Sequence, residues 1–240
     1  MRHIYVDEPP QGEIYTLTEK ERLHHLCAVL RVRTGDEIAL FDRQGRIYTG
    51  RIAKIEKNGL TVRIEKSLEP GPQRFNLTIA CAVPQGSGMD DIVDKLTQLG
   101  ADIIIPMITE RVVASPREPE KKLERWRKIA LGAAEQSQRR TLPEIPGILK
   151  LTEVLQKTAE YDLKLIPTLG SSTGPLSRVM DKFSVGKIAI LIGPEGDFTP
   201  LEVDKAVREG FTPVSLGKNV LKVDTAALAV CSAVKLALTD

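Results

Sequence analysis

The chain has 240 residues, of which 42% are hydrophobic, and a formal net charge of only +2 at pH 7. This is enough apolar material to bury a core in one or two domains. No apolar run approaches the roughly 20 residues that span a bilayer. The first residues lack the apolar core of a signal peptide, so we expect a cytoplasmic protein. Three scattered cysteines and three histidines form no ligand pattern, so we expect neither disulfides nor a metal site.

The first 68 residues predict a small β-domain. Short runs of alternating polar and apolar residues occupy 3–6, 37–40, 47–55 and 60–66, and turn-forming residues separate them. This pattern is typical of an antiparallel sheet. One helix-like piece, LTEKERLHHLCAVLRV (17–32), interrupts it. The Glu-Pro-Gly-Pro stretch at 69–72 is the strongest linker signal in the chain.

After the linker, strands and helices alternate. Buried-type strands are predicted at 77–83, 102–109, 163–168, 187–193 and 213–216. Helices are predicted at 89–99, 118–138, 152–161, 201–209 and from about 225 to 238. Such alternation predicts an α/β domain with a mostly parallel sheet that is covered by helices on both faces.

The segment 111–140 is basic, with nine Lys or Arg and four Asp or Glu. One interpretation is a solvated helix face with i,i+4 ion pairs, such as Glu118 with Lys122 and Glu124 with Lys128. The other is a surface that follows the phosphates of a nucleic acid. Glu135, Gln136 and Ser137 at its end are spaced either for contacts near a ligand or for a buried polar network.

The stretch LIGPEGDFTP (191–200) reads as a strand, a sharp turn and a helix start. Thr199-Pro200-Leu201-Glu202 is a capping box with proline at the first helical position. No Walker lysine and no GxGxxG fingerprint is present, and the carboxylates of Glu195 and Asp197 would repel a phosphate. The turn therefore suits a cationic ligand, or is an ordinary βα turn with acidic surface residues.

A second junction, SLGKNVLKVDTAALAV (215–230), again runs from a strand through a glycine into a helix, with Asp224 as the expected N-cap. Its loop is unusually apolar, with Val220, Leu221 and Val223. Exposed apolar loops usually cover something. One acidic and one apolar loop together could enclose a flat heterocycle that carries a positive group, and S-adenosylmethionine fits that description.

Several motifs in order along the chain resemble one family. GPEGDFTPLE is similar to the GPEGGFS-x-x-E motif of the bacterial 16S ribosomal RNA uridine-N3 methyltransferases, the small-subunit methyltransferase E family of the SPOUT superfamily. LGKNVLKVDTAAL resembles its LGxRILRxETA motif. Three further segments are also similar to it: HHLCAVLRVRTGDEIALFDRQGRIY, DKLTQLGADIIIPMITERVV and RWRKIALGAAEQSQRRTLPEI.

The resemblance implies a PUA-like β-barrel RNA-binding domain at 1–70 and a SPOUT methyltransferase domain at 74–240, with a trefoil knot at its C-terminus. It further implies a homodimer that binds S-adenosylmethionine in the knot and methylates N3 of a uridine in 16S rRNA of the small ribosomal subunit. The sequence departs from the family motifs at several positions. The family has lysine at Gln85, arginine at Asn219 and Lys222, glycine at Asp197, and glutamate at Asp90, Gln98 and Asp224.

The resemblance places the cofactor-binding residues in three loops. They are Leu165, Thr168, Leu169, Gly170, Ile192, Gly193, Pro194, Glu195, Gly196, Leu216, Gly217, Val220, Leu221 and Thr225. The candidate RNA-binding residues are Arg31, Arg125, Arg127, Arg139 and Arg140.

Three residues are candidates for catalysis. Lys222 would stabilise negative charge on the uracil oxygens, unless it is a plain surface lysine. Asp224 would act as a base or orient the base, unless it only caps the helix. Arg111 would bind phosphate or reach the active site, unless it makes a salt bridge at the flank of a helix.

Two alternative functions stay open. One is methylation of a different RNA, such as a tRNA or another rRNA site, by the same fold. The other is a non-catalytic protein that binds RNA during ribosome assembly. A NAD-linked enzyme is disfavoured because the glycine fingerprint is missing.

Overall fold

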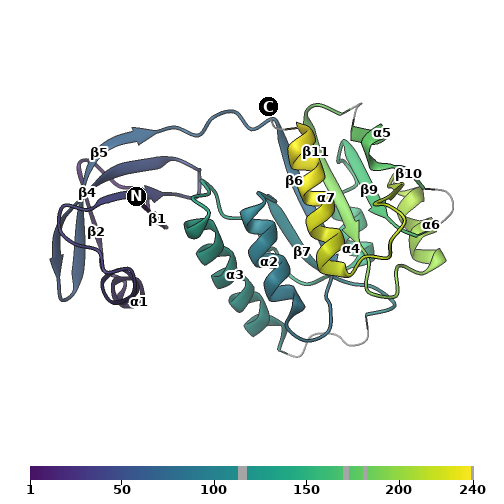
Figure 1. Cartoon of the computed structure of the whole chain (residues 1–240), viewed down its shortest axis with the longest axis horizontal. Helices are drawn as coiled ribbons and strands as arrows, with labels where there is room; N and C mark the ends of the chain where they lie inside the picture. The colour runs from purple at the N-terminus through teal and green to yellow at the C-terminus, as the bar shows by residue number, and fades with distance from the viewer. Residues whose placement is uncertain (113–117, 170–172, 181–182, 239–240) are drawn as a thin grey trace. The chain divides into compact units, whose positions relative to one another are not determined.

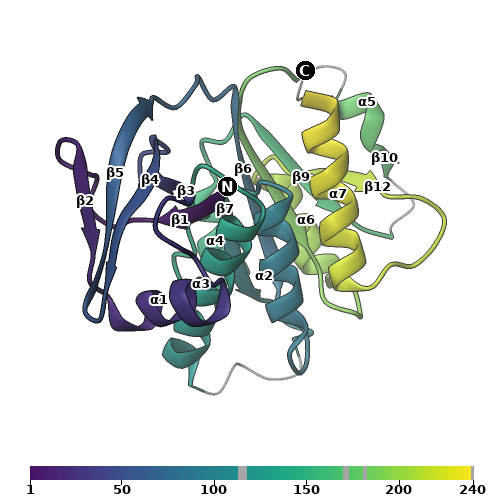
Figure 2. The ribbon, with the colours of Figure 1, turned by 60° about the vertical axis from the view of Figure 1, so that its left-hand side comes forward.

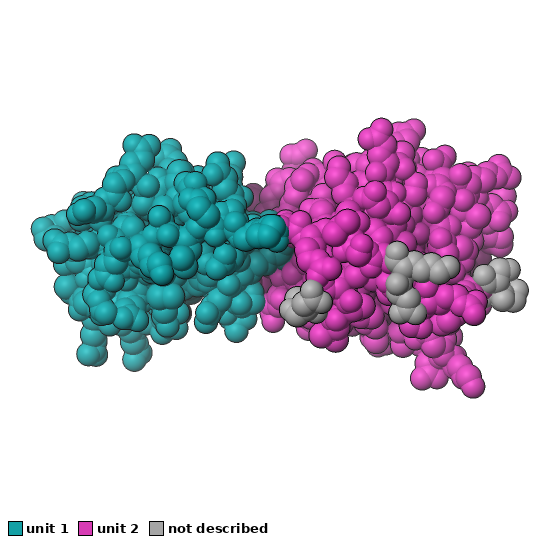
Figure 3. Space-filling model, turned by 90° about the horizontal axis from the view of Figure 1, so that it is seen from above, with its two compact units in different colours: residues 1–72, 134–142 teal, residues 73–133, 143–240 magenta. Residues whose placement is uncertain are grey.

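The computed structural model describes residues 1–112, 118–169, 173–180 and 183–238. It divides into two compact units, which Figure 3 colours separately: Met1–Pro72 with Ala134–Leu142, and Gln73–Ala133 with Pro143–Asp240. The sequence assigned 134–142 to the second domain, whereas its contacts group it with the N-terminal unit. Each unit has its own hydrophobic core.

The N-terminal unit is built on a five-stranded mixed sheet in the order β1-β3-β4-β5-β2. The strands are β1 (Arg2–Tyr5), β2 (Ile14–Leu17), β3 (Glu37–Phe41), β4 (Ile47–Glu56) and β5 (Gly59–Leu68). The prediction of a wholly antiparallel sheet was wrong for one pair, because β1 runs parallel to β3. The long connection between these two strands, which contains β2 and a helical segment, is the kind of crossover that a parallel pair requires.

The predicted helical piece after β2 is confirmed. It consists of α1 (Lys20–His24), which continues directly into one π-helical turn, η1 (His25–Val29). Leu23 and Leu26 point from it into the core of this unit, where they join buried residues of the sheet such as Leu40 and Val62. Burial of these apolar side chains fixes the helical piece on the sheet.

A buried polar network holds residues 134–142 in the N-terminal unit. Oε1 of Glu135 accepts hydrogen bonds from the backbone N–H of Tyr5, at 3.0 Å, and from Nη2 of Arg22, at 3.3 Å. Burial raises the pKa of Glu135, while the Tyr5 amide and the Arg22 charge oppose that rise. Of the two interpretations of Glu135 from the sequence, the structure favours the buried polar network.

The second unit contains a seven-stranded sheet in which every pair is parallel. Its order is β10-β12-β9-β11-β6-β7-β8. The strands are β6 (Phe75–Ala82), β7 (Ile103–Ile108), β8 (Leu149–Lys150), β9 (Leu163–Pro167), β10 (Gly174–Pro175), β11 (Gly186–Ile192) and β12 (Thr212–Ser215). The predicted α/β class and parallel sheet are thus confirmed, and the two-residue strands β8 and β10 were not predicted.

Helices cover both faces of this sheet (Figures 1 and 2). The helices are α2 (Gly88–Gln98), α3 (Pro119–Gln136), α4 (Leu151–Lys157), α5 (Leu176–Met180), α6 (Pro200–Arg208) and α7 (Val223–Leu238). Side chains of α2, α3 and α7 form one core cluster with Leu77 and Ile79 of β6. Side chains of α4 and α6 form the other cluster with Ala80 of the same strand. Alternate residues of a strand point to opposite faces, so a strand covered on both sides is apolar throughout.

The order of the sheet places the late strand β11 between the earlier strands β6 and β9. The carboxyl ends of β9, β11 and β12 therefore lie near one another at the same edge. The predicted trefoil knot in this region stays a prediction. No helix in the described parts of the chain is long and apolar enough to cross a membrane.

Candidate functional site

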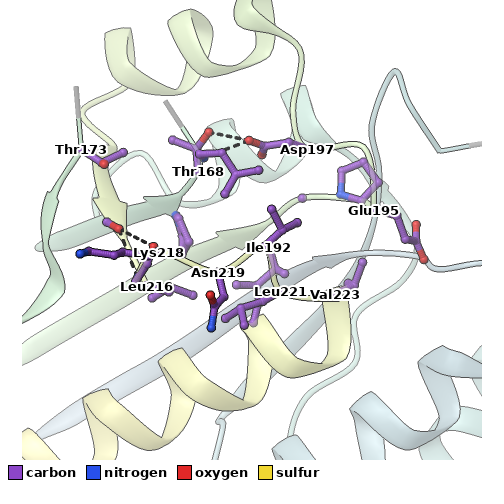
Figure 4. Close-up of a pocket in the computed structure, with 18 residues that line it drawn as sticks. Thr168, Thr173, Ile192, Glu195, Asp197, Leu216, Lys218, Asn219, Leu221 and Val223 are labelled. Atoms are coloured by element: carbon purple, nitrogen blue, oxygen red, sulfur yellow. Dashed lines mark hydrogen bonds between the residues drawn. The ribbon is translucent and has the colours of Figure 1, made fainter. Parts of the chain in front are cut away.

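A pocket of about 200 Å³ opens at the carboxyl edge of β9, β11 and β12 (Figure 4). Three chain segments line it: the end of β9 with the residues just after it, the turn after β11, and the loop between β12 and α7. The lining residues are Pro167, Thr168, Leu169, Thr173, Ile192, Gly193, Pro194, Glu195, Asp197, Ser215, Leu216, Gly217, Lys218, Asn219, Val220, Leu221, Val223 and Ala226.

The turn after β11 has a defined backbone. The N–H of Asp197 donates to the carbonyl of Pro194 at 2.9 Å, and Asp197 has a left-handed φ of 59°. Phe198 then turns inward and is buried in the core. A Cβ on Gly193 would lie only 3.0 Å from the Phe198 ring, so the first glycine of the motif makes room for that side chain.

The capping box predicted after this turn is confirmed. Thr199 accepts a hydrogen bond from the N–H of Glu202, and Glu202 accepts one from the N–H of Thr199. Glu202 is only 3% exposed, and its other oxygen accepts the backbone N–H of Glu110 at 2.8 Å. The hydroxyl of Thr199 also donates to the Glu110 carboxylate, at 3.1 Å. The start of α6 is thereby fastened to the segment after β7.

Arg111 supports the turn instead of facing the pocket. Its Nη1 donates to the carbonyls of Gly196 and Phe198. A Cβ on Gly196 would lie 3.5 Å from Cδ of Arg111, so the guanidinium stem packs against the turn. Arg111 does not line the pocket. Arg111, predicted to be catalytic, therefore contacts the turn 193–198 and holds it in position.

The loop between β12 and α7 is held more loosely. The hydroxyl of Ser215 bonds both the N–H and the carbonyl of Gly217, each at 3.2 Å. Gly217 has a φ of 124°, a conformation that favours glycine. Within the described residues, the backbone groups of 219–221 make no hydrogen bond. Val220 is 72% exposed, although it is apolar.

The pocket edge is electronegative. Glu195 and Asp197 line it together with a single cation, Lys218, among the described residues. Burial, and then the nearby carboxylates of Glu195 and Asp224, raise the pKa of the Cys81 thiol above its usual range. Cys81 is paired with Ile192 at the same edge of the sheet. The negative charges of Glu195 and Asp224 therefore reach the carboxyl edge of the sheet, where Cys81 lies.

The pocket chemistry fits S-adenosylmethionine. Apolar side chains such as Ile192, Leu221 and Val223 offer a surface for a flat ring. Backbone donors and acceptors at 219–221 without partners among the described residues suit the polar edge of a purine. The carboxylate of Glu195 suits positive charge, whereas both oxygens of Asp197 accept hydrogen bonds from the chain itself. Over the parts of the chain that the structure describes, no group of His, Cys, Asp or Glu could hold a metal ion.

Most residues that the sequence predicted as cofactor ligands line this pocket. They are Thr168, Leu169, Ile192, Gly193, Pro194, Glu195, Leu216, Gly217, Val220 and Leu221. Leu165 lies fully buried in β9, Gly196 faces Arg111, and Thr225 is exposed in the first turn of α7, so these three lie outside the lining. Gly170 falls outside the described residues.

The predicted set of cofactor ligands omitted eight lining residues: Pro167, Thr173, Asp197, Ser215, Lys218, Asn219, Val223 and Ala226. Two of these, Asp197 and Val223, had already been placed by the sequence in the acidic and apolar loops that could enclose a ligand. Most of the eight stand inside the two quoted motifs, so their position in the loops was a usable signal. Thr173 had no such signal, because it precedes the unpredicted two-residue strand β10.

The two remaining catalytic candidates lie at the start of α7. Lys222 is exposed and follows the lining residue Leu221 directly. The N-cap prediction for Asp224 was wrong, because α7 already begins at Val223 and the N–H of Ala226 donates to the carbonyl of Lys222. The Asp224 carboxylate instead accepts from the N–H and hydroxyl of Thr225, at 2.7 and 3.2 Å.

The predicted RNA-binding arginines fall into two groups. In the second unit, Arg125 forms two hydrogen bonds to Asp90, and Arg127 donates to the carbonyl of Ile145. In the N-terminal unit, Arg31 and Arg140 are exposed. The half-buried Arg139 donates to Thr141 at 3.5 Å.

The solvated-face interpretation of the basic segment holds for part of α3. The predicted ion pair of Lys128 with Glu124 is present, at 3.0 Å. Glu118 pairs with Lys121 in place of Lys122.

Comparisons with known proteins agree with the geometry. A family described as RNA methyltransferase domain matches residues 71–235, and one described as RNA methyltransferase PUA domain matches 17–65. The ribosomal RNA small subunit methyltransferase E of Synechocystis is 34% identical over 88% of this chain and 69% of its own length. The protein of that name from Bacillus subtilis is 29% identical over 89% of this chain and 87% of its own length.

Solved structures extend the similarity to the whole fold. The ribosomal RNA small subunit methyltransferase E of Neisseria gonorrhoeae, bound to S-adenosylmethionine, superposes with a TM-score of 0.90 at 32% identity, covering 99% of this chain and 98% of that one. A putative methyltransferase of Legionella pneumophila in complex with the same cofactor gives 0.88 at 30% identity, with 99% and 98% covered. The chain therefore belongs to the ribosomal RNA small subunit methyltransferase E family.

Proposed function

We propose that this protein transfers the methyl group of S-adenosylmethionine to N3 of a uridine in the 16S rRNA of the small ribosomal subunit, in the cytoplasm. The observation that carries the proposal is the pocket at the carboxyl edge of β9, β11 and β12. Its apolar walls, its Glu195 carboxylate and the backbone groups of 219–221, which have no partner among the described residues, match this cofactor. Relatives that carry the ribosomal RNA methyltransferase name over nearly the full chain support the substrate.

When bound, S-adenosylmethionine supplies an electrophilic methyl group on a positively charged sulfur. In this proposal the predicted lining residues hold it: Ile192 and Leu221 cover the flat ring, and the backbone at 219–221 bonds the ring edge. Glu195 at the acidic end of the pocket favours the positive charge. The chain itself mainly aligns the reacting atoms and excludes water, which lowers the barrier by removing freedom of motion.

Lys222 and Asp224 are the proposed catalytic residues. Uridine N3–H is a weak acid, so negative charge spreads onto the uracil oxygens as the proton leaves. The exposed ammonium of Lys222 stands next to the pocket wall and is the proposed partner of that charge. Asp224 is the proposed group that receives or orients the proton. Arg111 is proposed to position the 193–198 turn through its carbonyl contacts.

RNA binding is proposed to rest on phosphate contacts. Aromatic residues make up only 4% of the chain, so stacking platforms for bases are scarce. Arg31 and Arg140 are exposed in the N-terminal unit, and Arg125 keeps 66% of its side chain exposed beside Asp90. Arg127 and Arg139 complete the proposed set. Binding through phosphates weakens steeply with salt. We further propose that the protein is a homodimer and that its cofactor site lies in a trefoil knot, as the family resemblance implies.

The experiment that tests this function uses the full chain, methyl-labelled S-adenosylmethionine and small ribosomal subunits that lack the modification, with bulk tRNA in parallel. Digestion of the RNA then identifies the labelled nucleoside. We expect N3-methyluridine in 16S rRNA alone. Label in tRNA or in another nucleoside would contradict the proposed substrate. Cofactor binding without any transfer would favour a protein that only binds RNA.

The same assay tests Lys222. Replacement by methionine keeps most of the stem and removes the charge, so we expect kcat to fall about a hundredfold with cofactor affinity unchanged. Lys218, the exposed lysine that lines the pocket four residues earlier, provides the matched variant. A loss of kcat confined to the Lys218→Met variant would contradict the role of Lys222.

A further inference from the structure

The carboxylate of Asp197 joins two walls of the pocket (Figure 4). Its Oδ2 accepts a hydrogen bond from the hydroxyl of Thr168, at 2.9 Å, and one from the backbone N–H of Leu169, at 3.1 Å. Its Oδ1 accepts the N–H of Phe198 at 2.8 Å. Thr168 and Leu169 come after β9, whereas Asp197 belongs to the turn after β11. The two segments are 29 residues apart in the chain and become one unit through this side chain.

The backbone conformation at Asp197 would suit glycine better than aspartate, so we infer that the aspartate is present for its side chain. Its φ of 59° lies in the left-handed region, where every residue except glycine carries a steric penalty. Glycine would form the same turn without that penalty. The hydrogen bonds to Thr168 and Leu169 offset the penalty and depend on the carboxylate.

The segment that Asp197 holds borders the pocket directly. Thr168 and Leu169 both line it, and the Leu169 side chain is 60% exposed. The N–H of Thr168 is bonded to the carbonyl of Val214, at 3.2 Å, so the sheet reaches only to this residue. Beyond Thr168, the bond from the Leu169 amide to Asp197 fixes where the segment runs.

We propose that Asp197 is a positioning residue that fastens the segment 168–169 over the pocket and thereby sets the affinity for S-adenosylmethionine. This inference rests on the proposed function. A wall that already has its bound conformation need not be ordered when the ligand arrives. Without the carboxylate the segment samples other conformations, and the apparent dissociation constant rises by the inverse of the competent fraction.

The test is a double-mutant cycle on the full chain with Asp197→Gly, Thr168→Val and the combination. Glycine preserves the turn, and valine preserves the shape of threonine, so each removes one partner of the same hydrogen bond. Calorimetry measures the dissociation constants of S-adenosylmethionine and of S-adenosylhomocysteine, which lacks the methyl group and the positive charge. Asp204→Asn is the matched control, because Asp204 is an exposed carboxylate on α6 outside the pocket lining.

We expect Asp197→Gly to raise the dissociation constants of both ligands about tenfold, which corresponds to a competent fraction of about one tenth. Thr168→Val is expected to raise them about threefold, and the double variant no more than Asp197→Gly alone. An effect confined to the charged ligand would show instead that the Asp197 carboxylate attracts the sulfonium. Additive effects of the two substitutions would likewise overturn the proposal.

A measurement on the ligand-free protein separates this inference from the proposed function. Asp197→Gly is expected to speed hydrogen exchange of the Leu169 amide at least tenfold, whereas Asp204→Asn leaves it unchanged. Unchanged exchange in Asp197→Gly would overturn the fastening of the segment. If the unmodified chain bound neither ligand, the proposed function would be wrong, and so would the role of Asp197 in affinity. The exchange rate of the Leu169 amide would still show whether Asp197 holds the segment 168–169.

Discussion

The two loops that face each other across the pocket are held in opposite ways. The turn 193–198 is fixed by the chain itself: Arg111 binds two of its carbonyls, Phe198 anchors it in the core and Asp197 bonds the neighbouring segment. Among the described residues, the loop 216–221 is held by the two bonds between Ser215 and Gly217, and beyond them Val220 is 72% exposed. The turn 193–198 is therefore already fixed in the ligand-free protein, whereas the loop 216–221 leaves backbone groups available to a ligand.

This difference separates two kinds of free energy. Substitutions that loosen the turn 193–198 remove contacts of the folded protein, so they lower the free energy of unfolding first and the affinity second. Substitutions at 219–221 remove few contacts of the ligand-free protein, so they lower the affinity first. Measurements on both walls can break or sharpen this contrast, from the largest expected effect to the smallest.

The largest effect is expected for Glu202→Ala at the base of the turn. Glu202 is buried, and its two oxygens accept the N–H groups of Glu110 and Thr199 at 2.8 and 2.9 Å. Removing the carboxylate leaves both donors without a partner, so we expect a loss of about 3 kcal/mol in the free energy of unfolding, measured by denaturant titration. Glu209→Ala, at the exposed end of the same helix, should stay within about 0.5 kcal/mol. A small loss in Glu202→Ala would contradict the view that the turn is fixed by the chain.

The contrast also explains what the sequence could predict. The capping box of Thr199 and Glu202 was predictable because it depends on residues three positions apart. The contacts of Arg111 with Gly196 and of Glu135 with Tyr5 were not, because they join residues 85 and 130 positions apart. Periodicity identifies an element but does not show which distant groups it meets.

The start of α7 illustrates a local rule that failed. Asp224 is a favourable N-cap residue, yet the helix begins one residue earlier, at Val223, whose side chain is 4% exposed and belongs to the core. Burial of Val223 outweighs the preference for an aspartate cap, since tertiary packing overrides local propensity. Family motifs located the pocket loops, but they could not show that Asp197, an aspartate where the motif has glycine, would bond Thr168.

The second effect concerns hydrogen exchange on cofactor binding. The backbone amides of 219–221 have no partner among the described residues, so they should exchange fast in the ligand-free protein. S-adenosylhomocysteine at 100 times its dissociation constant should slow them up to about a hundredfold. The Asp197 amide, already bonded to Pro194, should change much less. Exchange measured by NMR would contradict the contrast if Asp197 slowed more than the loop.

An intermediate effect is expected for Arg111→Met, which keeps the packing stem and removes the donors to Gly196 and Phe198. We expect a loss of about 1 kcal/mol in the free energy of unfolding, and a rise of a few fold in the cofactor dissociation constant. Arg208→Met on the exposed side of α6 is the control and should change neither. If kcat alone fell, with stability and affinity intact, Arg111 would be a catalytic residue and not a support of the turn.

The smallest change in stability is expected at Val220, where the contrast is sharpest. Its side chain is 72% exposed, so Val220→Asn should alter the free energy of unfolding by less than about 0.5 kcal/mol. Because Val220 lines the pocket, the same change should weaken cofactor binding about fivefold, the equivalent of covering part of one apolar side chain. Val185→Asn, at a valine 60% exposed outside the pocket lining, should change neither quantity. Equal cofactor affinity in the Val220 and Val185 variants would mean that the loop 216–221 does not contact the ligand. The contrast between a turn that is fixed by the chain and a loop that binds the ligand would then be wrong.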